Sequence, residues 1–141
     1  MWTCFGLPGE SFGKVVCEPP ASTVKYLAKI GGKRGLFRGA PLNTNLCYSN
    51  PAVRRRIAEA VAQRCKEIPD VDYMQVWLAD SKNNQCECEK CQAMRPSDWY
   101  VMILNEIDEK LTKMKLDTKI VFLMYVDLLW SSRRIFRQGR L

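Results

Sequence analysis

The spacing of apolar positions predicts two amphipathic helices in the middle of the chain. Over residues 51–67 and again over residues 98–115, apolar side chains recur every three or four positions and so share one helical face. Asn50 before Pro51 is a favourable start for the first helix, which Pro69 ends. Ser97 is the expected N-cap of the second helix, with Asp98 in its first turn. The two buried stripes are predicted to be Val53, Ile57, Val61, Cys65 and Ile68, and Tyr100, Leu104, Ile107, Leu111 and Met114.

Two shorter segments, residues 73–79 and 119–126, are almost continuously apolar and predict strands. Such continuity is typical of strands that are covered on both faces. Over residues 51–127 the order is helix, strand, helix, strand, which is the order of a parallel α/β sheet. Two parallel strands do not complete such a sheet, and the Gly- and Pro-rich residues 1–45 show little periodicity. We therefore expect an α/β fold that is a fragment of a (β/α)8 TIM-like barrel.

The composition excludes several classes of protein. The chain has 141 residues, is 47% hydrophobic and 26% charged, and contains no histidine. Histidine-dependent triads and HExxH zinc sites are therefore excluded. No apolar run reaches the roughly 20 residues of a membrane span. The N-terminal residues lack the basic and apolar regions of a signal peptide, so none is expected there.

The net charge of +7 is concentrated in two segments without acidic residues, 25–38 and 131–141. A nucleic-acid surface needs basic and aromatic residues gathered on one folded face. Because the basic residues lie at the two ends of the chain and the middle is nearly neutral, we do not favour nucleic acid as the partner.

Asp80 and Asp127 directly follow the two predicted strands and are the candidate catalytic residues. Functional groups of parallel α/β folds sit at the C-terminal ends of strands. One crossover helix joins these strands, so the two carboxylates are expected at the separation used by glycoside hydrolases, roughly 5–9.5 Å. Trp77, Tyr125 and Trp130 are the candidate substrate-binding residues, able to stack on a sugar face. In the alternative interpretation Asp80 caps a loop, Asp127 pairs with an arginine, and the aromatic side chains belong to the core.

Cys86, Cys88 and Cys91 form a C-x-C-x-x-C motif whose thiolates are close enough in sequence to bind one tetrahedral Zn²⁺. A closed structural zinc site needs four ligands, and Cys47 or Asp80 is the candidate for the fourth. A disulfide between two of the three cysteines and three free thiols are the alternatives. Cys65 belongs to the buried stripe of the first helix and is expected to serve packing alone.

Taken together, these motifs resemble the bacterial domain-of-unknown-function family DUF4838 over roughly residues 26–130. The shared segments are LCYSNPAV, VWLADSKNNQCECEKCQAMRPSDWYVMILNEIDEKL, KIVFLMY and the stretch from Lys25 to Arg34 with its Gly-Lys-Arg end. The resemblance implies a TIM-barrel domain similar to α-glucuronidase-like and hexosaminidase-like glycoside hydrolases, found in large, exported bacterial proteins for polysaccharide use. It assigns no catalytic residue, so the roles of Asp80 and Asp127 depend on strand-end position.

These observations predict that residues 25–130 are a partial barrel of a carbohydrate-active protein, with a polysaccharide or oligosaccharide as partner. Residues 1–24 are unassigned. The chain has Ser131-Ser132-Arg133-Arg134 where the family pattern has Pro-Pro-Glu, so we interpret residues 131–141 as frameshifted sequence without a native role. The alternatives are a small cysteine-metal knuckle that binds nucleic acid through its basic ends, and a carbohydrate-binding barrel without catalysis. No cofactor is required, and a structural zinc ion is a candidate at Cys86, Cys88 and Cys91.

Overall fold

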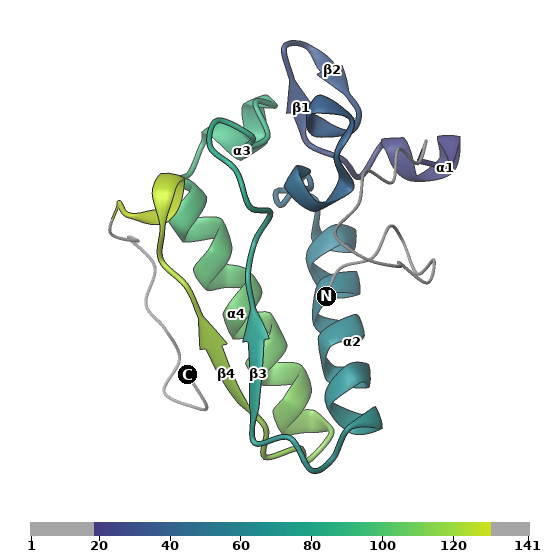
Figure 1. The fold of residues 1–141 in the computed structure, drawn as a ribbon, viewed down its shortest axis with the longest axis vertical. Helices are drawn as coiled ribbons and strands as arrows, with labels where there is room; N and C mark the ends of the chain where they lie inside the picture. The colour runs from purple at the N-terminus through teal and green to yellow at the C-terminus, as the bar shows by residue number, and fades with distance from the viewer. Residues whose placement is uncertain (1–18, 131–141) are drawn as a thin grey trace.

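A computed structural model of the chain describes residues 19–130, and its centre is a β/α unit (Figure 1). Helix α2 (Pro51–Glu67) leads into strand β3 (Tyr73–Val76), and helix α4 (Pro96–Lys113) connects β3 to strand β4 (Lys119–Phe122). The two strands pair in parallel, with Tyr73 opposite Lys119 and Val76 opposite Phe122. The predicted α/β class and element order are confirmed. Within residues 19–130 the parallel sheet has two strands, so the structure shows no TIM barrel.

The part of the chain before α2 is built from short elements. Helix α1 (Ala21–Val24) precedes an antiparallel hairpin of β1 (Lys29–Ile30) and β2 (Lys33–Arg34). Gly31 and Gly32 form its turn with positive φ angles of 56° and 80°, the conformation that a two-residue hairpin loop requires. Two 3₁₀ turns follow, η2 (Phe37–Gly39) and η3 (Pro41–Asn43). Two further short elements, α3 (Glu89–Gln92) and η4 (Val126–Leu128), lie in the segments after β3 and β4.

Both long helices are found where the apolar spacing predicts them, but the start of α4 differs. The Asn50 side chain caps α2 by accepting a hydrogen bond from the Ala52 backbone at 3.0 Å, as expected. Helix α4 begins at Pro96 with Arg95 as its N-cap, so the prediction of Ser97 as N-cap is wrong. Proline is favoured at the first helical position, which moves the start two residues upstream. The Asp98 carboxylate then accepts a hydrogen bond from the Arg95 backbone at 3.2 Å.

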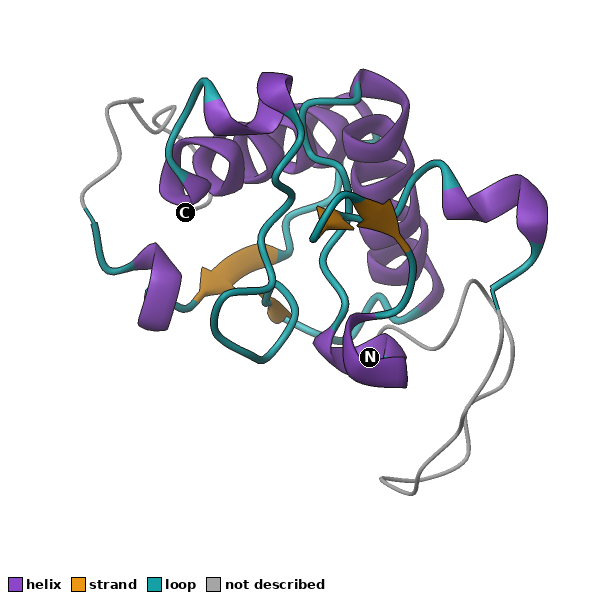
Figure 2. Cartoon of the chain, turned by 90° about the horizontal axis from the view of Figure 1, so that it is seen from above, coloured by secondary structure: helices purple, strands orange, loops and turns teal. Residues whose placement is uncertain are grey.

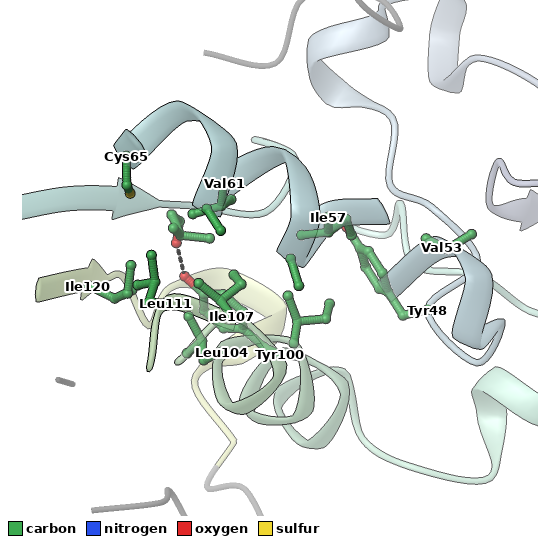
Figure 3. Close-up of a cluster of buried hydrophobic side chains, with 14 of the residues drawn as sticks. Tyr48, Val53, Ile57, Val61, Cys65, Tyr100, Leu104, Ile107, Leu111 and Ile120 are labelled. Carbon is green, nitrogen blue, oxygen red and sulfur yellow. Dashed lines mark hydrogen bonds between the residues drawn. The ribbon is translucent and has the colours of Figure 1, made fainter. Parts of the chain in front are cut away.

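The hydrophobic core lies between α2, α4 and one face of the sheet (Figure 3). The predicted stripes supply most of it: Val53, Ile57, Val61 and Cys65 on α2, and Tyr100, Leu104, Ile107 and Leu111 on α4, are all buried. Tyr100 also joins the two strands, because its hydroxyl donates to the Val76 carbonyl and accepts from the Leu123 backbone. Burial raises the pKa of this hydroxyl to about 12, so it stays protonated and keeps donating.

The prediction that both strands are buried on two faces is wrong for this chain. Burial alternates along β3 and β4, and the side chains on the outer face are exposed. Tyr73 is 58% exposed and Trp77 48%. The physical reason is that α2 and α4 lie to the same side of the two strands (Figure 2), so the side chains that face away from these helices stay exposed. None of the described helices is both long and apolar enough to cross a membrane.

We expect Tyr100→Phe to lower the free energy of unfolding by about 1–3 kcal/mol, because it leaves the buried Val76 carbonyl and the Leu123 amide without this partner. Urea unfolding followed by circular dichroism measures this change. Tyr26→Phe is the matched control, since that half-buried ring contacts Lys25 and Arg56 through its face. Equal unfolding midpoints for Tyr100→Phe and the wild type would refute the bridging role.

Candidate metal centre and strand-end carboxylates

The motifs gather at one end of the molecule. Both strands point toward this end, where the β1–β2 hairpin, α3 and η4 also lie (Figure 1). Two groups of side chains suited to metal binding or catalysis lie here. One is a cluster of four cysteines, and the other is a set of carboxylates and aromatic rings at the ends of β3 and β4.

Four cysteines, Cys47, Cys86, Cys88 and Cys91, bring their Sγ atoms within 4.8 Å of one another. The Sγ atom of Cys47 is 3.7 Å from that of Cys88 and 3.9 Å from that of Cys91. Four sulfur atoms bound tetrahedrally to one ion at about 2.3 Å would be about 3.8 Å apart. The four sulfur atoms are therefore compatible with a structural metal ion. Of the two candidates for the fourth ligand, the structure selects Cys47 rather than Asp80.

Three separate segments place these sulfur atoms. Cys47 follows Leu46, which forms an isolated antiparallel bridge with Leu27 just before α2. Cys86 and Cys88 lie in the loop after β3, and Cys91 lies in α3. All five described cysteines are free thiols, so no disulfide replaces the cluster within residues 19–130. Cys65 is buried in the core, as predicted.

Backbone amides donate to two of the sulfur atoms, and a hydroxyl group lies beside them. The Lys29 amide donates to Cys86 Sγ at 3.3 Å, and the Ser49 amide donates to Cys91 Sγ at 3.4 Å. The Cys91 thiol donates to the Ser49 hydroxyl oxygen at 3.1 Å, and the same hydroxyl lies 3.7 Å from Cys88 Sγ. The two backbone amides stabilise negative charge on sulfur, as the outer groups of a metal site do.

The same surroundings give these thiols different pKa values. Burial opposes ionisation of Cys88, but hydrogen bonds from the Cys91 backbone and the Ser49 hydroxyl outweigh it and lower the Cys88 pKa to about 6. Burial raises the pKa of Cys91 to about 12 and also raises that of Cys86. The Cys88 thiol therefore ionises more readily than those of Cys86 and Cys91, which must lose their protons to bind a metal ion.

The β1–β2 hairpin covers the cysteine loop. The Glu87 amide donates to the Lys29 carbonyl at 2.7 Å, and the Glu87 carboxylate accepts from the Gly31 amide at 2.7 Å. Arg34 on β2 donates to the Leu27 carbonyl and has its Nη1 atom 3.9 Å from Cys86 Sγ. Although burial acts in the opposite direction, the neighbouring Cys47, Cys86 and Cys88 raise the Arg34 pKa above its usual value.

A buried pair of asparagines connects the cysteine cluster to the end of β3. Asn45 and Asn84 are both 0% exposed, and the Asn45 amide group donates to Asn84 Oδ1 at 2.8 Å. Asn45 Oδ1 accepts from the Tyr48 hydroxyl at 2.8 Å and from the Ala79 amide at 3.3 Å. Asn84 in turn donates to the Asn43 carbonyl at 2.8 Å. The loop that contains Asp80 is thus held between the strand end and the cysteine cluster.

The ends of β3 and β4 are joined by the residues that follow them. The Tyr125 hydroxyl lies 3.2 Å from the carbonyl oxygens of both Leu78 and Ala79, to which it donates. The Asp127 carboxylate accepts a hydrogen bond from the Asn83 amide at 2.9 Å. Burial and the charges of Asp80 and Asp127 raise the Tyr125 pKa, so both carboxylates act on the same hydroxyl. Asp80 is exposed and Asp127 is half-buried.

The three candidate aromatic residues differ in exposure. Trp77 is 48% exposed and Trp130 is 73% exposed, whereas Tyr125 is half-buried and makes the hydrogen bonds described above. Leu129 is 69% exposed beside Trp130. The alternative expectation that all these rings belong to the core is therefore wrong for the two tryptophans.

Several residues of this region were not among the sequence candidates. Arg34, Ser49, Asn45 and Asn84 surround the cysteines or connect them to the Asp80 loop. A signal was present for Arg34, because it ends the Gly-Lys-Arg part of the family pattern. Nothing in the spacing of the two asparagines distinguishes them from ordinary loop residues.

The fold and the site define a class, namely an α/β chain with a four-cysteine centre beside the C-terminal ends of two parallel strands. The chain belongs to the family described as Domain of unknown function (DUF4838), whose model matches residues 22–129. Neither the comparison with curated proteins nor the comparison with solved structures gives a match. The match ends before the basic residues 131–141, which also lie outside the described residues, as do residues 1–18.

Proposed function

We propose that this chain is a zinc-stabilised segment of a carbohydrate-active β/α protein. The single observation that supports the zinc ion is the convergence of four cysteine sulfurs within 4.8 Å of one another. Three of these cysteines are buried, and the distances from Cys47 Sγ to the Sγ atoms of Cys88 and Cys91 suit tetrahedral thiolate coordination. With all four positions taken by protein ligands, such an ion stabilises loops and leaves no position for substrate.

What the zinc ion stabilises is the loop after β3. This loop contains Asp80 at its start and Cys86 and Cys88 at its end, and it has few apolar side chains to hold it in place. Linking it to Cys47 fixes it against the segment that precedes α2. One zinc ion for each chain in protein purified under reducing conditions is the expected result, and elemental analysis measures it.

The carbohydrate proposal depends on the strand ends. Hydrogen bonds from Tyr125 and to Asp127 tie the two strand-end segments together, which supports a joint role for the carboxylates of Asp80 and Asp127. Exposed Trp77 offers a ring on which the apolar face of a sugar can stack. If the chain hydrolyses glycans, one carboxyl group acts as general acid and the other as base or nucleophile. If it only binds them, the same residues serve as hydrogen-bond and stacking partners.

We expect Trp77→Ala to weaken polysaccharide binding about tenfold. Covering roughly 100 Å² of the ring with a sugar contributes on the order of 2 kcal/mol, and a factor of ten corresponds to about 1.4 kcal/mol. Affinity electrophoresis of the full chain in gels that contain one soluble polysaccharide at a time measures the binding.

Tyr73→Ala is the matched control for Trp77→Ala, because Tyr73 is an exposed aromatic residue at the start of β3, whereas Trp77 directly follows its end. Tyr73→Ala should bind as the wild type does. Retardation of the wild type by none of a broad set of neutral and acidic polysaccharides would overturn the carbohydrate proposal. Equal losses in both variants would show that binding is not located at the strand ends.

A further inference from the structure

The β1–β2 hairpin places a cation, the guanidinium of Arg34, beside the cysteine centre. Arg34 is half-buried, and its guanidinium lies beside Cys86, interacts with Cys47 and Cys88, and donates to the Leu27 carbonyl. Lys33, its neighbour on the same strand, is exposed. Of these two adjacent basic residues, one is directed at the thiols.

Four thiolates around a divalent ion leave a net charge of −2, and three of the four cysteines are buried. Negative charge in such surroundings is costly unless it is compensated by a neighbouring charge or by hydrogen bonds. The amides of Lys29 and Ser49 supply partial compensation at Cys86 and Cys91. Only a full positive charge removes one of the two excess negative charges, and guanidinium retains its charge when it is buried.

We propose that Arg34 is the charge-compensating residue of the metal centre and determines how tightly the ion is held. This inference rests on the metal proposal above. The hairpin positions the guanidinium in two ways, through the Leu27 carbonyl and through the Glu87 contacts with Lys29 and Gly31. The sequence motif Gly-Lys-Arg therefore acts with the cysteine motif, although 52 residues separate Arg34 from Cys86.

The test compares zinc affinities of Arg34→Met, Arg34→Lys and the wild type by competition with a chromophoric chelator under reducing conditions. Arg34→Met keeps the length of the side chain and removes its charge, and it should weaken zinc binding about 10–100-fold, the usual cost of losing an outer partner of a metal ligand. Arg34→Lys restores the charge without the planar fork and should recover part of the loss. Lys33→Met, with the same change in net charge on the same strand, should bind zinc as the wild type does.

The measurements separate this inference from the metal proposal. A wild-type chain that binds no zinc overturns both. A wild-type chain that binds zinc, with Arg34→Met within twofold of its affinity, overturns the role of Arg34 alone. A third outcome is that Arg34→Met loses zinc affinity and Arg34→Lys recovers none of it. The loss would then come from the Leu27 contact and not from the charge, and the inference would be overturned. Chelator-treated samples of each variant, unfolded in urea, show whether the metal-free fold is equally stable.

Discussion

Cys47→Ser should reduce zinc affinity as much as Cys91→Ser does, although Cys47 lies outside the C-x-C-x-x-C motif. Its Sγ atom is 3.7 Å from Cys88 and 3.9 Å from Cys91, the spacing of equivalent ligands. Structural zinc sites bind with roughly 10–16 kcal/mol, so an even share for each of four ligands is about 3 kcal/mol, or about a hundredfold in Kd. Chelator competition under reducing conditions measures the affinity of each variant.

Cys65→Ser is the control for this prediction. It makes the same chemical change at a buried cysteine of α2 that packs in the core, away from the metal centre. It should lower stability and leave zinc affinity unchanged. If Cys47→Ser bound zinc as tightly as the wild type while Cys91→Ser did not, the centre would consist of the motif cysteines without Cys47.

If the chain hydrolyses glycans, as proposed, Asp80→Asn should lower the rate about 10²–10⁴-fold, because the amide cannot exchange a proton as the carboxyl group does. The measurement is the release of reducing ends from a polysaccharide that the wild-type chain cleaves. Asp127→Asn should lower the hydrolysis rate as well. It should also loosen the loop after β3, because the Asp127 carboxylate accepts a hydrogen bond from the Asn83 amide. Hydrogen exchange of residues 79–88 separates these two effects.

Asp70→Asn is the matched control. Asp70 is an exposed acid like Asp80, but it lies in the turn between α2 and β3, before the strand and not after it. It should keep full activity. Wild-type turnover in Asp80→Asn would contradict the assignment of Asp80 as general acid or base. Retention of binding with no turnover in the wild type would favour a carbohydrate-binding protein.

Local patterns in the sequence were enough to locate the helices, because a buried helical face imposes a regular spacing of apolar residues. The limits of α2 are confirmed, and so are the buried stripes of both helices apart from their last members, Ile68 and Met114, which are half-buried. The start of α4 was misplaced because Ser97 and Pro96 both favour a helix start and the proline prevails. The burial of the strands was mispredicted because the apolar residues of a strand do not reveal which of its faces another element covers.

The candidate site was only partly predictable for a different reason. Cys86, Cys88 and Cys91 are neighbours in sequence, so their grouping was visible at once. Cys47 was one of two candidates for the fourth position, and the choice depends on a bridge between Leu27 and Leu46 that spacing does not reveal. Arg34 reaches the cluster through a hairpin. Contacts of this kind arise from tertiary structure and have no local signature.

The coordination of the bound ion tests the central claim most directly. X-ray absorption at the zinc edge, on the chain reconstituted with one equivalent of zinc under reducing conditions, gives the number and type of ligand atoms. The four-cysteine centre predicts four sulfur neighbours at about 2.3 Å and no nitrogen or oxygen neighbour. A first shell with oxygen or nitrogen at about 2.0–2.2 Å, or a chain that retains no zinc, would contradict it.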